Sequence, residues 1–219
     1  MAITGKLVRL QRMSDEDYEQ LAKWSSGQSG AYSSASAEFL SGEELRDFSR
    51  QSGHQYLAVV TDEGQLVGVA DYSRATYAGN YEIGINIGDP KHWGAGYGAE
   101  ALSLLLRHLF HSKNAHRVQG VVGLYNKRSV RLVGERGFIF EGLLRDYFFL
   151  DGVYHDGVSI SMLRDDYYAL GPESPLAPPE DIVPAEDRAQ AKEATRVLLA
   201  GRTGAHLRSF LEHTRDIRA

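Results

Sequence analysis

The stretch YEIGINIGDPKHWGAGYGAEAL, residues 81–102, decides the fold of this chain. Its first eight residues alternate strictly, with Tyr81 and three isoleucines on one face and small or polar residues on the other, which predicts a half-buried β-strand. Glycines follow at positions 94, 96 and 98, and apolar residues at 102, 105, 106 and 109 then recur at helical spacing. The stretch therefore predicts a strand that leads into a helix through a glycine-rich turn.

The glycine turn, Gly94-Ala95-Gly96-Tyr97-Gly98-Ala99, is typical of an anion site, because glycines let backbone N–H groups approach a phosphate at the positive end of a helix. Its letters also fit the G-x-G-x-x-A pattern of a dinucleotide site, and a tight turn without a ligand is a further alternative. A dinucleotide fold needs the turn directly after its first strand and a carboxylate about 20 residues later, and neither is found. A nucleoside-triphosphate loop is excluded, because no Lys-Ser or Lys-Thr pair follows the glycines.

The periodicity on either side of this stretch predicts the remaining elements. Strands are expected at residues 7–10, 56–61, 66–72, 81–88, 118–124, 140–150 and 153–162, and helices from Ser14, near 41–50, at 99–111 and at 127–136. Asp62-Glu63-Gly64 and Asp151-Gly152 are hairpin signals. The fold class is therefore mixed α/β of the α+β type: a central, mostly antiparallel twisted sheet of six to seven strands, about four flanking helices and a C-terminal helical tail.

The composition excludes several classes of protein. The 219 residues are 42% hydrophobic and carry a formal charge of −5, the profile of a globular chain without a polyelectrolyte partner, so nucleic acid is not expected. The absence of cysteine excludes a thiol nucleophile, a disulfide framework and a thiolate zinc site. His108, His111 and His116 lack a ligand spacing, so no metal is predicted. Without a signal-like or membrane-spanning apolar run, we expect a cytoplasmic protein with no membrane partner.

Proline marks the expected domain boundary, because five of the six prolines lie in residues 172–184. We therefore predict a domain at residues 1–171, a proline-rich linker at 172–184 and a helical extension at 185–219. The extension is too short for a core of its own. Its apolar stripe at helical spacing indicates packing on its own domain, a homodimer contact or a lid on a neighbour; the stripe comprises Leu207, Phe210, Leu211 and Ile217.

Three segments together resemble the N-acetyltransferases of the GNAT family. They are LVRLQRMSDEDYEQLAKW at 7–24, the stretch at 81–102, and NKRSVRLVGERGFIFEGLLRDYFFLDGVYHD at 126–156. The glycine turn alone is unspecific, but Asn126 and the Gly-Phe and Glu-Gly pairs at 137–138 and 141–142 follow it in the order of that family. The resemblance covers about residues 5–168 and is greatest to the ribosomal-protein and spermidine acetyltransferase branch. It implies a GNAT fold and transfer of acetyl from acetyl-CoA to an amine.

The resemblance also implies which residues hold acetyl-CoA. Its pyrophosphate would lie on the amides of the glycine turn and its pantetheine arm beside the strand, whose free edge supplies partners for two amides. The implied contacts are Asn86, Ile87, Gly88, Trp93, Gly94, Ala95, Gly96, Tyr97, Gly98 and Asn126. Trp93 replaces the basic or Gln residue that opens the family's motif, a change that leaves binding by the backbone intact. Asn126 could instead be a turn residue.

Direct attack by the amine needs a base, a site for the oxyanion and a proton donor. A Lys-like amine with a pKa of about 10.4 costs roughly 4.6 kcal/mol to deprotonate at pH 7, so a base matters most for such acceptors. Glu82 is the first candidate, because it shares a strand face with Asn86 and Gly88; a rim carboxylate is the alternative. Asp146 and Tyr147 are weaker candidates. The amide near Ile87 is the family's expected oxyanion site.

The proton donor departs from the family's common pattern. Many relatives place a Tyr seven residues after the Asn, and this chain has Val133 there. Ser129, three residues after Asn126, fits a variant of the branch in which a serine serves, although it could simply cap the short helix. His155 and Asp156 are interpreted as structural.

The acceptor is predicted from the Ser-rich patch at residues 25–37, which has no acidic residue. A polyamine or aminoglycoside pocket should carry carboxylates, so a peptide N-terminal α-amine or a small amino compound is favoured unless Asp71, Glu38 and Glu82 converge in space. A catalytically silent acyl-CoA-binding or interaction module is the alternative from another class.

Overall fold

The computed structural model describes residues 2–34, 39–171, 174, 176, 183–201, 204 and 205. The chain divides into two units, Met1–Pro178 and Pro179–Ala219. Within the described residues, no helix has the length and apolar character needed to cross a membrane.

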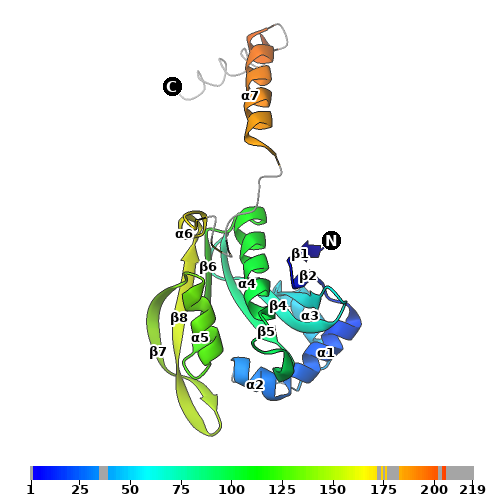
Figure 1. Ribbon diagram of the computed structural model, residues 1–219, viewed down its shortest axis with the longest axis vertical. Helices are drawn as coiled ribbons and strands as arrows, with labels where there is room; N and C mark the ends of the chain where they lie inside the picture. The colour runs from blue at the N-terminus through cyan, green and yellow to red at the C-terminus, as the bar shows by residue number, and fades with distance from the viewer. Residues whose placement is uncertain are drawn as a thin grey trace. The chain divides into compact units, whose positions relative to one another are not determined.

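The first unit is built on one eight-stranded sheet with the strand order β1-β2-β3-β4-β5-β6-β8-β7 (Figure 1). Every neighbouring pair is antiparallel except β5 and β6, which are parallel. The strands are β1 (Ala2–Thr4), β2 (Val8–Arg12), β3 (Gln55–Thr61), β4 (Leu66–Arg74), β5 (Asn80–Ile87), β6 (Arg117–Gly123), β7 (Ile139–Leu150) and β8 (Val153–Leu163). The predicted class and the mostly antiparallel sheet are confirmed.

Along the chain, helices lie between the strands of this sheet and after its last strand. They are α1 (Asp15–Ser25), α2 (Gln28–Ser34), α3 (Gly42–Ser52), α4 (Tyr97–Arg107), α5 (Lys127–Glu135) and α6 (Arg164–Tyr168), with a 3₁₀ turn η1 (Pro90–His92) and a π-turn η2 (His108–Ser112). The element counts need correction. The described part of the sheet gains the three-residue strand β1, and α2 forms inside the Ser-rich patch, whose sequence lacks the apolar periodicity of a helix.

Local signals set the helix starts as predicted. Ser14 accepts a hydrogen bond from the Asp17 N–H, and the Asp17 carboxylate accepts one from the Ser14 N–H, so both groups of the capping box are satisfied. Ser41 begins α3 through the same arrangement with Glu44. These boxes fix where α1 and α3 begin and therefore how they lie on the sheet.

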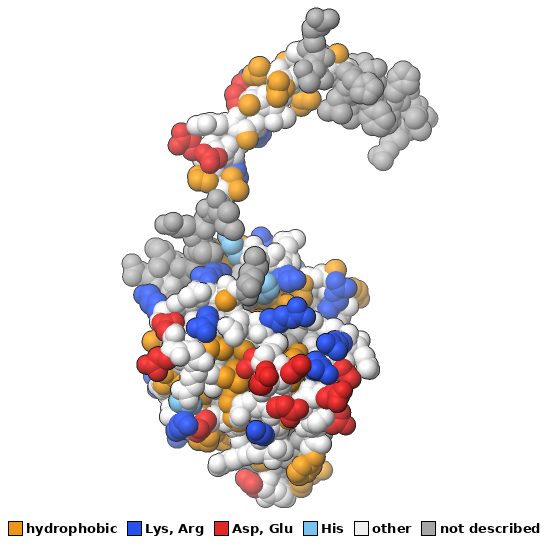
Figure 2. All heavy atoms as spheres, turned by 90° about the vertical axis from the view of Figure 1, so that its right-hand side faces the viewer, with side chains coloured by type: hydrophobic (Ala, Val, Ile, Leu, Met, Phe, Trp, Pro, Cys, Tyr) orange, Lys and Arg blue, Asp and Glu red, His pale blue; other side chains and the backbone are white. Residues whose placement is uncertain are grey.

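Each face of the sheet has its own core. The larger core includes Leu10, Leu105, Phe110, Val118 and Val133, which places α4 and α5 on one face. The smaller core, from Met13, Leu21, Leu45, Ala58 and Val69, places α1 and α3 on the other. We call these the α4 face and the α1 face. Figure 2 shows acidic and basic side chains lying side by side on the side of the first unit that it displays.

A carboxylate that the sequence did not single out ties the N-terminal strands to α4. Glu100 accepts hydrogen bonds from the N–H groups of Lys6, Leu7 and Val8 at 2.6–2.7 Å. Three donors on one carboxylate make a charge-assisted clamp. The clamp holds the first turn of α4 in place, and the glycine turn overlaps this first turn.

The sheet opens between β5 and β6. These two strands pair only where Asn80–Glu82 meet Arg117–Gln119, and no pairing continues beyond Glu82. Because β5 runs on to Ile87 and β6 to Gly123, their C-terminal halves face each other across an unpaired gap. This gap adjoins the glycine turn and gives the strand a free edge.

The domain boundary lies later than predicted. Leu176 is 2% exposed and belongs to the larger core, so the first unit continues past Gly171 to residue 178. In the second unit, the helix α7 (Ala185–Ala200) has exposed side chains throughout. The predicted apolar stripe at Leu207, Phe210, Leu211 and Ile217 lies outside the described residues.

Candidate functional site

The glycine turn has the geometry of an anion cradle. Gly94 and Gly96 have φ values of 85° and 88°, a left-handed conformation that glycine adopts without strain. The N–H groups of Gly96, Tyr97, Gly98 and Ala99 have no acceptor among the described residues. A Cβ on Gly94 would meet nothing within 4 Å, so one side of the turn is open. The free amides at the start of α4 suit a phosphate group.

The register of β5 shows which backbone groups face the gap. The Gly88 N–H donates to the Val67 carbonyl at 3.0 Å, so Ile87 and Gly68 form a non-hydrogen-bonded pair. The N–H and C=O groups of Ile85 and Ile87 therefore point away from β4, into the gap. Asn86 and Gly88 direct their backbone groups to β4 instead. Of the three residues predicted beside pantetheine, Ile87 alone offers its amide to the gap, whereas Asn86 places its side chain on the α1 face.

Three aromatic residues from three segments, with an arginine from a fourth, cross the gap on the α1 face. The Trp93 indole N–H donates to the Ile87 carbonyl at 2.7 Å, and the Tyr32 ring of α2 stacks on Trp93 with centroids 5.2 Å apart. Tyr32 also contacts the ring of Tyr125, which follows β6, edge to face at 5.9 Å. Arg128 of α5 lies over Trp93 at 5.0 Å. We call Tyr32, Trp93 and Tyr125 the aromatic bridge; sequence reasoning missed Tyr32, Tyr125 and Arg128, because they follow no common spacing.

Asn126 and Ser129 lie together at the start of α5. The Asn126 side-chain oxygen accepts the Ser129 N–H at 3.1 Å, so Asn126 is the N-cap of α5. Asn126 is buried, and among the described residues its side chain takes part in this one hydrogen bond, so its amide NH₂ remains available as a donor. Both the turn role and the contact role that the sequence left open fit this geometry. The Ser129 hydroxyl has no hydrogen-bond partner among the described residues.

The carboxylates of β4 and β5 share the α1 face. Glu82 is exposed, and its carboxylate has no hydrogen bond or ion pair with the described residues. Asp71 pairs with Gly84, and its carboxylate occupies the space that a Cβ on Gly84 would need. Asp71 and Glu82 are therefore diagonal neighbours on adjacent strands. Glu38, the third residue of the predicted convergence, lies outside the described residues.

Asp71 is held by a histidine. The His54 Nε2 lies 2.8 Å from the Asp71 Oδ1, and the His54 ring lies 4.6 Å from the ring of Tyr56. Burial, followed by the negative charge of Asp71, raises the pKa of Tyr56 to about 12. These residues form a polar cluster next to β5 that the sequence indicated only through Asp71.

The weaker catalytic candidates lie elsewhere. Asp146 has a φ of 51° in an irregular part of β7, where its N–H donates to the Asp156 carboxylate at 2.9 Å. That contact fits a bulge and supports a structural role for Asp156. Val133 is 7% exposed in the larger core, so α5 places no hydroxyl there.

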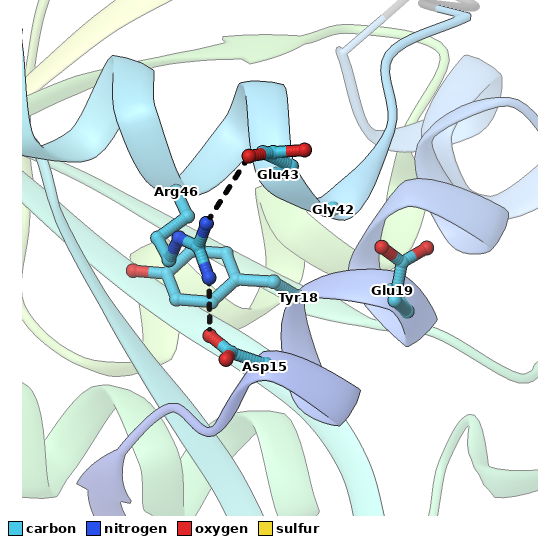
Figure 3. A pocket seen from close by; sticks show the side chains of 6 residues that line it. All are labelled: Asp15, Tyr18, Glu19, Gly42, Glu43 and Arg46. Carbon is cyan, nitrogen blue, oxygen red and sulfur yellow. Dashed lines mark hydrogen bonds and ion pairs between the residues drawn. The ribbon is translucent and has the colours of Figure 1, made fainter.

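Two cavities lie near the N-terminal helices. One, of about 240 Å³, separates α1 from α3, and there Arg46 pairs with Asp15 at 2.7 Å and Glu43 at 3.6 Å (Figure 3). The other, of about 400 Å³, is lined by Trp24, Asp89 and His92 among others. In the ranges that the structure describes, no three His, Asp or Glu side chains are grouped as a metal site.

A sheet that opens beside a glycine-rich helix start, with free amides on both, defines a class of protein that binds an extended, phosphate-bearing ligand. The family described as the acetyltransferase (GNAT) domain matches residues 8–139, more than half of the chain. The chain therefore belongs to the GNAT acetyltransferase family.

Relatives and solved structures agree with this assignment. The chain is 31% identical over 127 residues to the [Ribosomal protein uS5]-alanine N-acetyltransferase of Escherichia coli, matching 56% of this chain and 64% of that protein. It is 32% identical over 78 residues to a spermidine N(1)-acetyltransferase of Vibrio cholerae, 36% of this chain and 45% of that one. The match thus spans less than two thirds of either relative.

The fold likeness extends further than the sequence likeness. A crystal structure of spermidine N-acetyltransferase from Vibrio cholerae in complex with CoA and spermine superposes with a TM-score of 0.68 at 22% identity. It covers 74% of this chain and 99% of that one. A GNAT-family acetyltransferase from Bacillus anthracis gives a TM-score of 0.64 over 75% of this chain and 99% of that chain, also at 22% identity. These likenesses establish the fold.

Proposed function

We propose that the protein transfers the acetyl group of acetyl-CoA directly to a primary amine, on a peptide N-terminus or a small amino compound. One observation carries this proposal: the free amides of the glycine turn and the inward-facing amide of Ile87 adjoin the same gap. Phosphate would bind the former, while the latter would donate to the oxygen that becomes negative as the amine attacks. Acetyl-CoA supplies the activated acetyl group.

The side chains divide the remaining work. Glu82 projects from β5 on the α1 face and would take a proton from the amine, directly or through water. Ser129 remains the proton donor predicted from the resemblance, and Asp146 remains a weaker candidate for the base. The implied cofactor contacts are retained with two refinements. Ile87 rather than Gly88 offers its backbone amide to the pantetheine arm. Asn126 offers its side-chain NH₂. A cytoplasmic location and a homodimer formed through the C-terminal extension also remain predictions.

Two observations keep a polyamine or aminoglycoside acceptor as the second candidate. Asp71 and Glu82 lie on one face beside the gap and would attract a polycation. A spermidine N(1)-acetyltransferase is among the relatives, alongside one that acts on an alanine of a ribosomal protein. The Ser-rich patch, without carboxylates, favours the peptide or small amine.

The test is an acceptor screen with the full-length protein. Acetyl-CoA is supplied with peptides that begin with Ala or Ser, with spermidine and with an aminoglycoside, and both thiol release and product mass are measured. We expect an acetylated peptide or small amine to form fastest. Spermidine turnover far above that of the peptides would transfer the assignment to polyamines.

The silent-module alternative needs a binding measurement beside the rate. CoA affinity is determined by calorimetry for the wild type, Glu82→Gln and Ser129→Ala. Loss of rate with unchanged CoA affinity supports catalysis. CoA binding without transfer to any amine would identify an acyl-CoA-binding module instead.

A further inference from the structure

We infer that Tyr125 is the proton donor of the transfer reaction, with its phenol protonating the sulfur that leaves the acetyl group. This inference rests on the proposed function and fills the role that Val133 leaves vacant. Tyr125 directly precedes Asn126 and is missing from the predicted site residues.

The position of the ring is the first support. Tyr125 follows the last residue of β6, and its ring folds back over Gly123 so closely that a Cβ there would collide with it. The aromatic bridge then leads from Tyr125 through Tyr32 to Trp93, whose indole binds the Ile87 carbonyl. Tyr125 and Ile87 therefore lie on opposite sides of the gap in which the thioester would lie. The aromatic bridge thus connects the residue proposed as proton donor to the residue proposed as oxyanion donor across the gap.

The state of the hydroxyl is the second support. The Tyr125 hydroxyl is buried and has no hydrogen-bond partner among the described residues. The rings in contact with Tyr125 come from α2, β7 and β8: Tyr32 at 5.9 Å, Phe148 at 5.8 Å and His155 at 5.1 Å. Burial, followed by the interaction with Tyr32, raises the pKa of Tyr125. The phenol therefore stays protonated at neutral pH and has a proton to give.

Its chemistry suits the leaving group better than the alternative does. A thiol has a pKa of about 8.5 and a phenol one near 10, which burial raises further in Tyr125, so the phenol is the weaker acid of the two but is still closer in acidity to a thiol than an aliphatic hydroxyl is. The aliphatic hydroxyl of Ser129 is a much weaker acid. Of the titratable groups that touch the Tyr125 ring, Tyr32 is also a phenol, and His155 lies within 3.3 Å of the Leu150 carbonyl.

The proposed step balances without an added reagent. The amine lone pair forms the new C–N bond, and the C–S bond then breaks with its electron pair moving to sulfur. The Tyr125 O–H proton moves to that sulfur, which gives a free thiol and a phenolate. The amine nitrogen releases a proton as it is acetylated, and water carries that proton to the phenolate. The net products are the acetylated amine and CoA.

The experiment compares Tyr125→Phe with the wild type in the full-length protein. Because Phe keeps the ring contacts and removes a hydroxyl that has no partner, the variant should fold and bind CoA with unchanged affinity. We expect kcat to fall about 100-fold or more, within the range of general-acid catalysis, while the KM for acetyl-CoA stays within about twofold. Tyr154→Phe is the matched control, since that phenol is 65% exposed on the β7–β8 hairpin, which also carries Phe148 and His155, and should leave kcat unchanged.

The pH profile separates a donor from a structural ring. The wild-type kcat should fall at high pH as the phenol loses its proton, and Tyr125→Phe should lack this limb. Replacing Tyr125 by 3-fluorotyrosine, a more acidic phenol, should move the limb to lower pH. An unchanged kcat in Tyr125→Phe, or a limb that persists in it, would overturn the inference, as would a large loss confined to Ser129→Ala. Failure of the wild type to acetylate any amine would overturn the proposed function and this inference together.

Discussion

The indole N–H of Trp93 donates a 2.7 Å hydrogen bond to the backbone carbonyl of Ile87. This bond joins the glycine turn to the free edge of β5, two parts of the site that would hold opposite ends of an extended ligand. The bond also occupies the Ile87 carbonyl, so the Ile87 N–H is the backbone group of this residue that remains for a ligand. The bond gives Trp93 a positioning role, which differs from the role of the basic or Gln residue that opens the family's motif.

Trp93→Phe should weaken acetyl-CoA use. Phe keeps an aromatic ring against Tyr32 but loses the hydrogen bond to Ile87, a loss of about 1 kcal/mol. We expect the KM for acetyl-CoA to rise about fivefold, with a smaller change in the KM for the amine. Steady-state kinetics with each substrate varied will check this, with Tyr32→Phe as the control that keeps both contacts. Equal changes in the two variants would argue against the role assigned to the indole.

Gly94→Ala should impair cofactor binding more than it impairs folding. Gly94 has φ 85° and open space around it, and Gly64, in the β3–β4 hairpin, matches it with φ 86° and nothing within 4 Å. Either alanine should cost about 1 kcal/mol of stability through backbone strain. A Cβ on Gly94 alone would stand where a phosphate approaches, so we expect about tenfold weaker CoA binding in that variant. Calorimetry and thermal unfolding on both variants give the comparison; similar CoA affinities would contradict the cradle.

Glu141 should make folding stability depend on acid pH. Its carboxylate receives hydrogen bonds from Arg117 and from Ser161, and these, with Arg117 the larger cause, lower the pKa of Glu141 to about 2 from 4.5. A depressed folded pKa stabilises the protein above pH 4.5, and that contribution is lost as the pH falls from 4.5 towards 2. Because the side chain is 36% exposed, solvent screening limits the contribution to about 1–2 kcal/mol.

The measurement is urea unfolding of the wild type and Glu141→Gln between pH 2.5 and 7, a range set by the two pKa values. The wild type should be more stable at pH 7, and the difference should shrink steadily as the pH falls from 4.5 to 2.5. Glu135→Gln is the control, since its pair with Arg131 is more exposed and should contribute little to stability at any pH. A pH-independent difference would exclude the ionised carboxylate as its source.

Truncation should locate the end of the first unit. A chain that stops after residue 171 loses Leu176, whose burial stabilises by about 1.5–3 kcal/mol, whereas a chain that stops after residue 178 retains it. We expect denaturation to separate the two by this amount, and Leu176→Ala in the full chain to lose about 2–4 kcal/mol. Light scattering on the longer truncation also tests the predicted homodimer, because removing the extension should then yield a monomer. Equal stability of the two truncations would return the boundary to Gly171.

Local signals carried most of the fold in the sequence. The serines that begin α1 and α3 satisfy their own helix ends, and Asp151-Gly152, with φ values of 54° and 78°, supplies the left-handed pair that its hairpin needs. The alternation of residues 81–88 fixed both the strand and its buried face. The helix α2 was missed because tertiary contacts of Tyr32, rather than periodicity, secure it.

The sequence by itself determined most of the elements, the family and the glycine turn, because capping, alternation and left-handed glycines act within a few residues of each other. Tertiary structure alone decided which groups meet at the gap. The divergence of β5 from β6 selected Ile87 over Gly88, and folding brought Tyr32, Trp93 and Tyr125 together from positions far apart in the chain. Val133 held the family's position for a hydroxyl and lies in the core, while the buried hydroxyl beside the gap belongs to Tyr125. Such placements depend on the path of the whole backbone, which no local pattern encodes.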